Sequence, residues 1–297
     1  MSDRPEGLLH RRAFLKKGLA LAGGLATLGP GQSLAIDRSE PAHWAFLSDT
    51  HIAEDPDNTY RGFRPYQTLQ EITGQIGSAL PDGLVITGDL ARLKGHAGDY
   101  RNLRTLLTPI ADQRPIHLAT GNHDNRGNFR RAFAGPDAYH WAVKGKHIVT
   151  VHTGPVRLVI LDSLLFIDLP WGQLGGAQRR WLDTYLRVCD NTPVVLFVHH
   201  PIVGDDALWD ARRFLDLVKP MAKVKAIVHG HSHKFRYHQF EGIHVVGLPA
   251  TGYNMYDEDP VGWVVARLTK DHGVFTLHAI DGNTRLNSHT ERLRWRT

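Results

Sequence analysis

Short apolar runs recur along the chain and alternate with segments in which apolar residues return every three to four positions. The runs have the length of strands and lie at 43–48, 84–87, 115–120, 147–152, 156–162, 193–198, 225–229, 243–248, 263–268 and 274–280. The segments with helical spacing are 65–80, 98–112, 174–188 and 207–222.

This alternation favours βαβ units in the first half of the domain. The strands of 243–280 have shorter connections, which are more typical of an antiparallel meander. Arg292, Arg294 and Arg296 alternate with apolar residues, which favours a terminal strand with one solvated face over a nucleic-acid patch. The pattern predicts one α/β domain in which two sheets could pack between layers of helices.

The first 35 residues differ from the rest. They carry a net charge of +3 out of the chain's +5, followed by an apolar run, Gly18 to Gly29, that is too short to span a bilayer. Arg11 and Arg12 precede this run and resemble a twin-arginine export signal, with an amphipathic surface helix or a disordered leader as the alternative. We expect residues 1–35 to be that signal and 36–297 to be a single domain, exported to the periplasm or secreted through the twin-arginine translocation machinery.

Composition limits the possible partners. With 42% hydrophobic and 22% charged residues, the chain resembles a soluble globular protein with a large core. Beyond residue 35 the net charge is only +2, so we expect no stable nucleic-acid or membrane partner. Cys189 is the single cysteine, so the chain cannot form an internal disulfide.

Polar residues follow five of the predicted strands. The carboxyl ends of strands are where open α/β sheets bind ligands, so these residues form a candidate site. Each of these five groups of residues, the strand tips, is by itself a common turn sequence. The ordered series of all five rarely arises by chance. The tips are Asp49-Thr50-His51, Gly88-Asp89, Gly121-Asn122-His123-Asp124, His199-His200-Pro201 and Gly230-His231-Ser232-His233.

This series resembles the signature of the calcineurin-like metallophosphoesterases, and the likeness covers 43–250. The resemblance implies a four-layer α/β/β/α sandwich with two metal ions at the strand ends. It implies that Asp49, His51 and His233 hold one metal, that Asn122, His199 and His231 hold the other, and that Asp89 bridges them. It further implies that His123 faces the scissile phosphate and that Asp124 orients this imidazole through a hydrogen bond.

The donor set fits such chemistry. Imidazole and carboxylate ligands without thiolate suit Mn, Fe, Zn or Co, whose identity the sequence leaves open. Two divalent or trivalent ions would supply a bridging hydroxide near neutral pH for attack on phosphorus, and His123 is the expected general acid. We expect His229 to be a core histidine bonded to backbone, and His200 to point away from the metals.

The sequence leaves the substrate open. Arg126 would approach the phosphate or cap the next helix, and Tyr60, Tyr253 and Tyr256 would stack on a base or simply pack. Acidic loops favour a monoanionic diester over a dianionic monoester if they ring the site. We therefore expect hydrolysis of a small phosphodiester, with a phosphomonoesterase as the first alternative and a non-catalytic metal-binding scaffold as the second.

Overall fold

The computed structural model describes residues 40–133 and 142–297, and within these ranges it contains two six-stranded sheets. The first has the order β12-β11-β10-β1-β2-β3. In it β1 runs parallel to β2 and antiparallel to β10. Its strands are β1 (Ala42–Leu47), β2 (Gly83–Ile86), β3 (Ile116–Leu118), β10 (Pro260–Leu268), β11 (His272–Gly282) and β12 (Thr290–Arg294).

The second sheet has the order β4-β5-β6-β7-β9-β8, and its four central strands are parallel. These strands are buried on both faces and apolar nearly throughout, as the centre of a covered parallel sheet requires. Its strands are β4 (Val149–His152), β5 (Arg157–Ile160), β6 (Val194–Val198), β7 (Val224–His229), β8 (Arg236–Phe240) and β9 (Ile243–Gly247).

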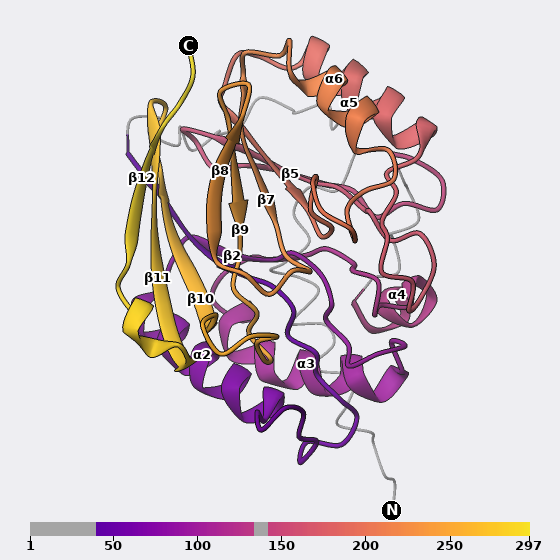
Figure 1. Cartoon of the computed structure of the whole chain (residues 1–297), viewed down its shortest axis with the longest axis vertical. Helices are drawn as coiled ribbons and strands as arrows, with labels where there is room; N and C mark the ends of the chain where they lie inside the picture. The colour runs from indigo at the N-terminus through magenta and orange to yellow at the C-terminus, as the bar shows by residue number, and fades with distance from the viewer. Residues whose placement is uncertain (1–39, 134–141) are drawn as a thin grey trace, which may run out of the picture.

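Helices cover the outer face of each sheet (Figure 1). The helices α2 (Pro65–Ala79), α3 (Ala97–Ala111) and α4 (Arg126–Phe133) pack on the first sheet, and α5 (Gly176–Val188) and α6 (Ala211–Val218) pack on the second. A short 3₁₀ helix, η1 (Thr284–Leu286), precedes β12.

The layers follow from where the apolar residues lie. In α2, Leu69, Ile72 and Ile76 return at helical spacing and are fully buried, so one stripe of the helix faces the sheet. A third apolar cluster fills the space between the two sheets, where the rings of Phe46 and Phe197 meet edge to face with centroids 4.9 Å apart. The predicted four-layer α/β/β/α sandwich is therefore confirmed.

Four details differ from the sequence prediction. The strand expected at 243–248 is β9, but it pairs in parallel with β7, so the antiparallel meander comprises only β10, β11 and β12. The helix expected over 207–222 is shorter, because α6 spans Ala211–Val218. The polar strand β8 and the short, arginine-rich α4 were not predicted, since neither has a continuous apolar pattern.

The terminal strand is confirmed as β12, with Arg292 and Arg294 exposed and Leu293 buried between them. In the described part of the chain, no helix combines the length and hydropathy that crossing a membrane would take. The proposed export signal over 1–35 lies outside the described residues.

Candidate metal centre

The first sheet supplies its polar residues from loops that directly continue its strands. Beyond β1 and β2 the backbones stay paired, since the Asp49 amide donates to the Gly88 carbonyl (3.0 Å) and the His51 amide donates to the Asp89 carbonyl (3.0 Å). This backbone pairing places the side chains of Asp49, His51 and Asp89 together, just beyond the end of the sheet. All three are buried, with at most 2% of their surface exposed.

The second sheet supplies histidines from β6 and β7. His199 follows β6 directly, and His231 and His233 lie in the turn after β7. The two sheets meet here, because the His231 amide donates to the Asp49 carboxylate at 3.0 Å and 3.2 Å. The loops from the two sheets therefore converge, as the sequence predicted.

Backbone strain is concentrated in these loops. Five of the seven predicted metal ligands have positive φ angles, a conformation that costs a non-glycine residue on the order of 1 kcal/mol. A fold retains such strain where the surrounding contacts over-determine it, which is typical of functional sites. The five are Asp49 (53°), His51 (46°), Asp89 (47°), His231 (65°) and His233 (55°).

Two imidazoles face each other at one end of the site. The Nε2 atoms of His51 and His233 lie 3.2 Å apart, and the Nε2 of His233 is 3.4 Å from the Asp49 carboxylate. Each Nδ1 lies against a backbone carbonyl, at 3.3 Å for His51 and 2.6 Å for His233. Since a carbonyl only accepts, each Nδ1 carries the proton and each Nε2 presents a lone pair.

These two lone pairs repel unless a cation lies between them. Burial lowers the pKa of His51 to about 3, so this imidazole is neutral near pH 7 and cannot supply the proton that would bridge the pair. A metal ion bound by both nitrogens and by the Asp49 oxygen satisfies all three groups. The residues present therefore fit a metal ion.

A second group of donors lies beside Asp89. The Nε2 of His199 is 3.2 Å from the Asn122 side-chain oxygen and 3.4 Å from the Asp89 carboxylate. Burial lowers the pKa of His199, but the carboxylates of Asp89, Asp49 and Asp124 together outweigh burial and raise this pKa to about 9. The oxygens that stabilise a cationic imidazole here are also suited to holding a metal cation.

His231 completes this second group, with its ring centroid 5.1 Å from that of His199. Burial lowers the pKa of His231 to about 4, so its ring is neutral and has a lone pair to offer. The Nδ1 of His199 is buried with no hydrogen-bond partner among the described residues. Asp89 lies between the two groups, since one of its oxygens is 3.9 Å from the His51 Nε2 and 3.4 Å from the His199 Nε2.

His200 is closer to the site than the sequence analysis expected. One of its ring nitrogens lies within 4.8 Å of ring nitrogens of both His199 and His231. Its Nδ1 is 2.7 Å from the Ser163 hydroxyl, and its Nε2 is buried without a partner in the described part of the chain. His229 is confirmed as a buried strand residue, whose Nδ1 lies 3.0 Å from the Gly230 carbonyl.

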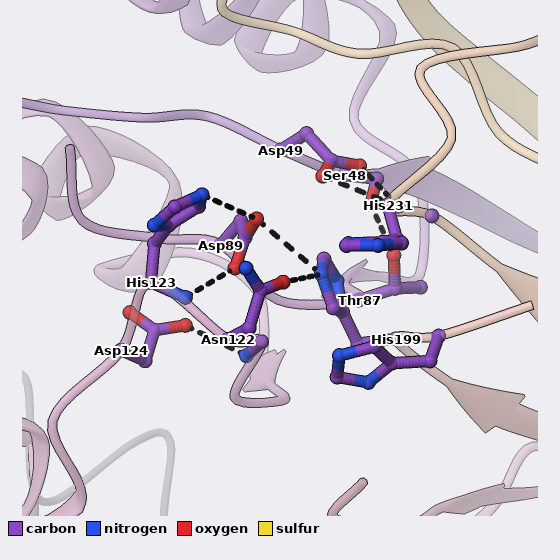
Figure 2. A network of polar contacts seen from close by, with 12 residues as sticks. Ser48, Asp49, Thr87, Asp89, Asn122, His123, Asp124, His199 and His231 are labelled. Carbon is purple, nitrogen blue, oxygen red and sulfur yellow. Dashed lines mark hydrogen bonds and ion pairs between the residues drawn. The ribbon is translucent and has the colours of Figure 1, made fainter. Parts of the chain in front are cut away.

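His123 lies at the accessible edge of the site, with 19% of its side chain exposed. Its backbone amide donates to Asp89 at 2.8 Å, and its Nε2 lies 4.0 Å from the other oxygen of the same carboxylate (Figure 2). Its Nδ1 is 2.9 Å from the Leu93 carbonyl and 3.6 Å from the Asp168 carboxylate. The imidazole thus directs Nε2 toward Asp89.

The predicted hydrogen bond from Asp124 to the His123 imidazole is wrong. The Asp124 carboxylate instead accepts hydrogen bonds from the backbone amides of Gly121 (2.8 Å), Leu90 (3.2 Å) and Ala91 (3.2 Å), and from the Tyr100 hydroxyl (2.9 Å). Asp124 therefore holds together the loops that follow β2 and β3. The local reason is the turn itself, which brings the carboxylate back onto the amide three residues earlier.

Arg126 is committed to a buried partner. Its Nε and Nη2 atoms donate to the two oxygens of Asp162, at 2.8 Å and 2.6 Å, and Nη2 also donates to the Leu164 carbonyl. Asn125 rather than Arg126 caps α4. Its side-chain oxygen accepts hydrogen bonds from the backbone amides of Gly127 at 2.9 Å and Asn128 at 3.1 Å. Neither of the two predicted roles of Arg126 matches these contacts.

Sequence reasoning missed three residues that shape the site. Tyr100 joins Asp124 to the Asn125 amide, and no sequence signal separates it from a core tyrosine of an amphipathic helix. Asp162 ends the predicted strand 156–162, so it is a sixth polar residue at a strand end and has the same sequence signal as the other five. Arg92 follows Asp89 by three positions and has no motif of its own.

Known proteins resemble this chain in sequence. The sequence profile of the calcineurin-like phosphoesterases matches residues 43–235. A probable cyclic nucleotide phosphodiesterase of Rhodococcus erythropolis is 31% identical over 72% of this chain and 72% of its own length. A 3',5'-cyclic adenosine monophosphate phosphodiesterase of Pseudomonas aeruginosa is 27% identical over 69% of this chain and 74% of its own length.

Solved structures share the fold. A dimetal phosphatase from Danio rerio has a TM-score of 0.66 at 17% identity, covering 86% of this chain and 99% of that one. A purple acid phosphatase from yellow lupin has a TM-score of 0.62 at 18% identity, covering 82% of this chain and 52% of that one. With its profile match over more than half its length and its His/Asp cluster, this chain belongs to the calcineurin-like phosphoesterase family of metal-dependent hydrolases.

Proposed function

We propose that this protein hydrolyses a small phosphodiester at a site for two metal ions. The observation that carries the proposal is the position of the Asp89 carboxylate between two sets of buried nitrogen and oxygen donors. Asp49, His51 and His233 would hold one ion, and Asn122, His199 and His231 the other, with Asp89 shared between them. When bound, two such ions neutralise the phosphate oxygens and lower the pKa of water.

The chain itself supplies the proton for the leaving group. Because the Nδ1 of His123 donates to the Leu93 carbonyl, its Nε2 is the atom that gains and loses a proton at the site. A protonated imidazole there can donate to the leaving alkoxide, which makes His123 the proposed general acid. Asp124 acts differently from the sequence prediction, since it positions the backbone of the Asn122–His123 loop rather than the imidazole.

Two observations favour a diester over a monoester. The relatives named above carry the names of phosphodiesterases, and a probable glycerophosphodiester phosphodiesterase of Arcobacter nitrofigilis is 26% identical over 63% of this chain and 70% of its own length. The loop after β1 is acidic, with Glu54, Asp55 and Asp57 exposed, and such a loop repels a dianion more than a monoanion wherever it borders the site.

A paired assay tests this proposal. The protein is reconstituted separately with manganese, zinc and iron, and its kcat/KM is measured on bis-p-nitrophenyl phosphate and on p-nitrophenyl phosphate. We expect the diester to be preferred by at least ~10-fold. A preference for the monoester assigns the site to a phosphomonoesterase, and a metal-free, inert protein assigns it to a scaffold.

The proposed export is tested separately. We propose that residues 1–35 direct the folded protein through the twin-arginine route, leaving 36–297 as a single mature domain in the periplasm or outside the cell. Changing both Arg11 and Arg12 to Lys is expected to block export in cell fractionation. Normal accumulation outside the cytoplasm would contradict the twin-arginine assignment.

A further inference from the structure

A tight hairpin fixes an aromatic side chain at the rim of the metal centre. Tyr60 and Phe63 exchange backbone hydrogen bonds of 3.0 Å and 2.9 Å, and the two residues between them, Arg61 and Gly62, have φ angles of 54° and 88°. Two consecutive positive φ angles are typical of a two-residue hairpin turn. Arg61 also donates to the Met255 carbonyl at 2.7 Å, which ties this hairpin to the loop after β9.

A series of rings leads from the candidate ligands to this hairpin. The Tyr253 ring lies 4.6 Å from the His51 ring and 4.8 Å from the His233 ring, centroid to centroid, and is only 3% exposed. The Tyr60 ring packs edge-on against Tyr253 at 4.6 Å and is 38% exposed. The series therefore starts in the metal centre and ends at the surface of the protein.

Arg92 lies at the outer end of this series. Its guanidinium carbon is 4.2 Å from the Tyr60 ring centroid and 5.8 Å from that of Tyr253, so the cation lies over Tyr60. Its backbone carbonyl lies 3.3 Å from the His51 Nδ1, which anchors the residue to the metal centre. Within 40–133 and 142–297, no carboxylate, carbonyl or hydroxyl accepts a hydrogen bond from the guanidinium.

We propose that Tyr60, Arg92 and Tyr253 form a subsite for the part of the substrate that lies beyond the scissile phosphate. A guanidinium has five donors and no acceptor, and it pairs best with two acceptors side by side. The subsite therefore selects a diester whose distal group presents two adjacent acceptor atoms. The O6/N7 edge of guanine has this pattern, whereas the corresponding edge of adenine pairs one acceptor with a donor.

The position of Arg92 favours the distal group over the phosphate itself. The Tyr253 ring contacts both His51 and His233 and also lies beneath Arg92, so it lies between the guanidinium and these two candidate ligands. The hairpin contacts and the cation–π contact hold Arg92 before substrate arrives, which reduces the entropy lost on binding. This inference deepens the function proposed above and rests on it.

Three substrates and matched variants test the subsite. Cyclic GMP and cyclic AMP differ at the base edge, and methyl phenyl phosphate carries a distal ring without any acceptor atom. Wild-type protein is compared with Arg92→Met, Arg92→Lys and Tyr60→Leu. The control is Arg101→Met, which removes the same charge from α3, where Arg101 forms an exposed ion pair with Glu54 of the loop after β1. Metal content and thermal unfolding are measured for every variant.

We expect wild-type protein to have a lower KM for cyclic GMP than for cyclic AMP. Arg92→Met should raise the KM for cyclic GMP about 10- to 100-fold with kcat nearly unchanged, and should leave the other two substrates within about twofold. Arg92→Lys should lose most of the preference, because an ammonium lacks the planar fork. Tyr60→Leu should weaken the preference in the same direction, and Arg101→Met should leave it intact.

Other outcomes separate the subsite from the function on which it rests. One outcome is that all three diesters are hydrolysed, but Arg92→Met changes their KM values by the same factor or leaves them all unchanged. In that case the subsite is wrong, whereas the proposed phosphodiesterase function is retained. If wild-type protein prefers cyclic AMP, the acceptor-pair assignment is wrong. If no diester is hydrolysed while p-nitrophenyl phosphate is, the proposed function fails and the subsite fails with it.

Discussion

At the scale of single residues, backbone carbonyls set the chemistry of the site. His51, His123 and His233 each place Nδ1 against a carbonyl, at 3.3 Å, 2.9 Å and 2.6 Å. This contact fixes the tautomer and the ring orientation, so each Nε2 faces the centre of the site. The same contact between Nδ1 and a backbone carbonyl therefore orients two proposed metal ligands, His51 and His233, and the proposed general acid, His123. The groups around each Nε2 determine which of these roles the imidazole takes.

The role of His123 predicts a dependence on the leaving group. His123→Gln should retain its bound metal but slow the hydrolysis of methyl phenyl phosphate about 10²- to 10⁴-fold, because phenolate leaves poorly without a proton. Methyl p-nitrophenyl phosphate should be affected much less, since p-nitrophenolate needs little protonation. The control is His43→Gln, which changes an exposed strand histidine. Equal slowing of both substrates would remove His123 from the role of proton donor.

At the scale of elements, the strand-end turns determine where the ligands lie, and glycines allow these turns to approach one another. A Cβ on Gly121 would clash with the Asp89 carboxylate and would lie 2.7 Å from the His199 Nε2. Gly121→Ala should therefore displace Asp89, reduce bound metal and lower kcat/KM by ~10²-fold or more, although Gly121 is not a ligand.

Gly74→Ala is the matched control for this prediction. A Cβ at Gly74 in α2 meets nothing within 4 Å, so the substitution should stabilise the helix by about 0.5–1 kcal/mol and leave activity unchanged. Metal analysis and thermal unfolding distinguish the two variants. Full metal content in Gly121→Ala would show that the loops after β2 and β3 can separate without loss of the site.

The strand ends also show which parts of the site can be predicted from the sequence. Asp49, Asp89 and His199 could be predicted because each directly follows a continuous apolar strand, and parallel strands bring such positions to one edge. The Asp124 carboxylate was misassigned because its partners are backbone amides of Leu90 and Ala91, more than 30 residues away, which side-chain patterns do not encode. Arg92 was missed for the same reason, since its environment comes from the 60–63 hairpin.

At the scale of the whole molecule, the candidate metal centre lies where the two sheets meet, next to the apolar core between them. Asp49 and Asp89 come from the first sheet, and His199 and His233 come from the second. Within the described residues, polar contacts such as that of the His231 amide with Asp49 already cross this boundary. Metal ions bound there would add ligand bonds across the same boundary, so metal binding and global stability should be coupled.

Removal of metal should therefore destabilise the entire domain and not only the loops. At a free metal concentration of 100 times its Kd, binding to the folded state alone adds about 2.7 kcal/mol to the free energy of unfolding. For a domain of this size, that corresponds to a rise in Tm of roughly 5–10 °C when the metal-free protein is reconstituted with manganese. Asp89→Asn should abolish most of this rise, whereas Asp216→Asn, on the exposed face of α6, should preserve it. Calorimetric scans on chelated and reconstituted protein measure both effects. An unchanged Tm in wild-type protein that demonstrably binds metal would show that the unfolded chain binds the metal as tightly as the folded domain does, and would contradict this coupling.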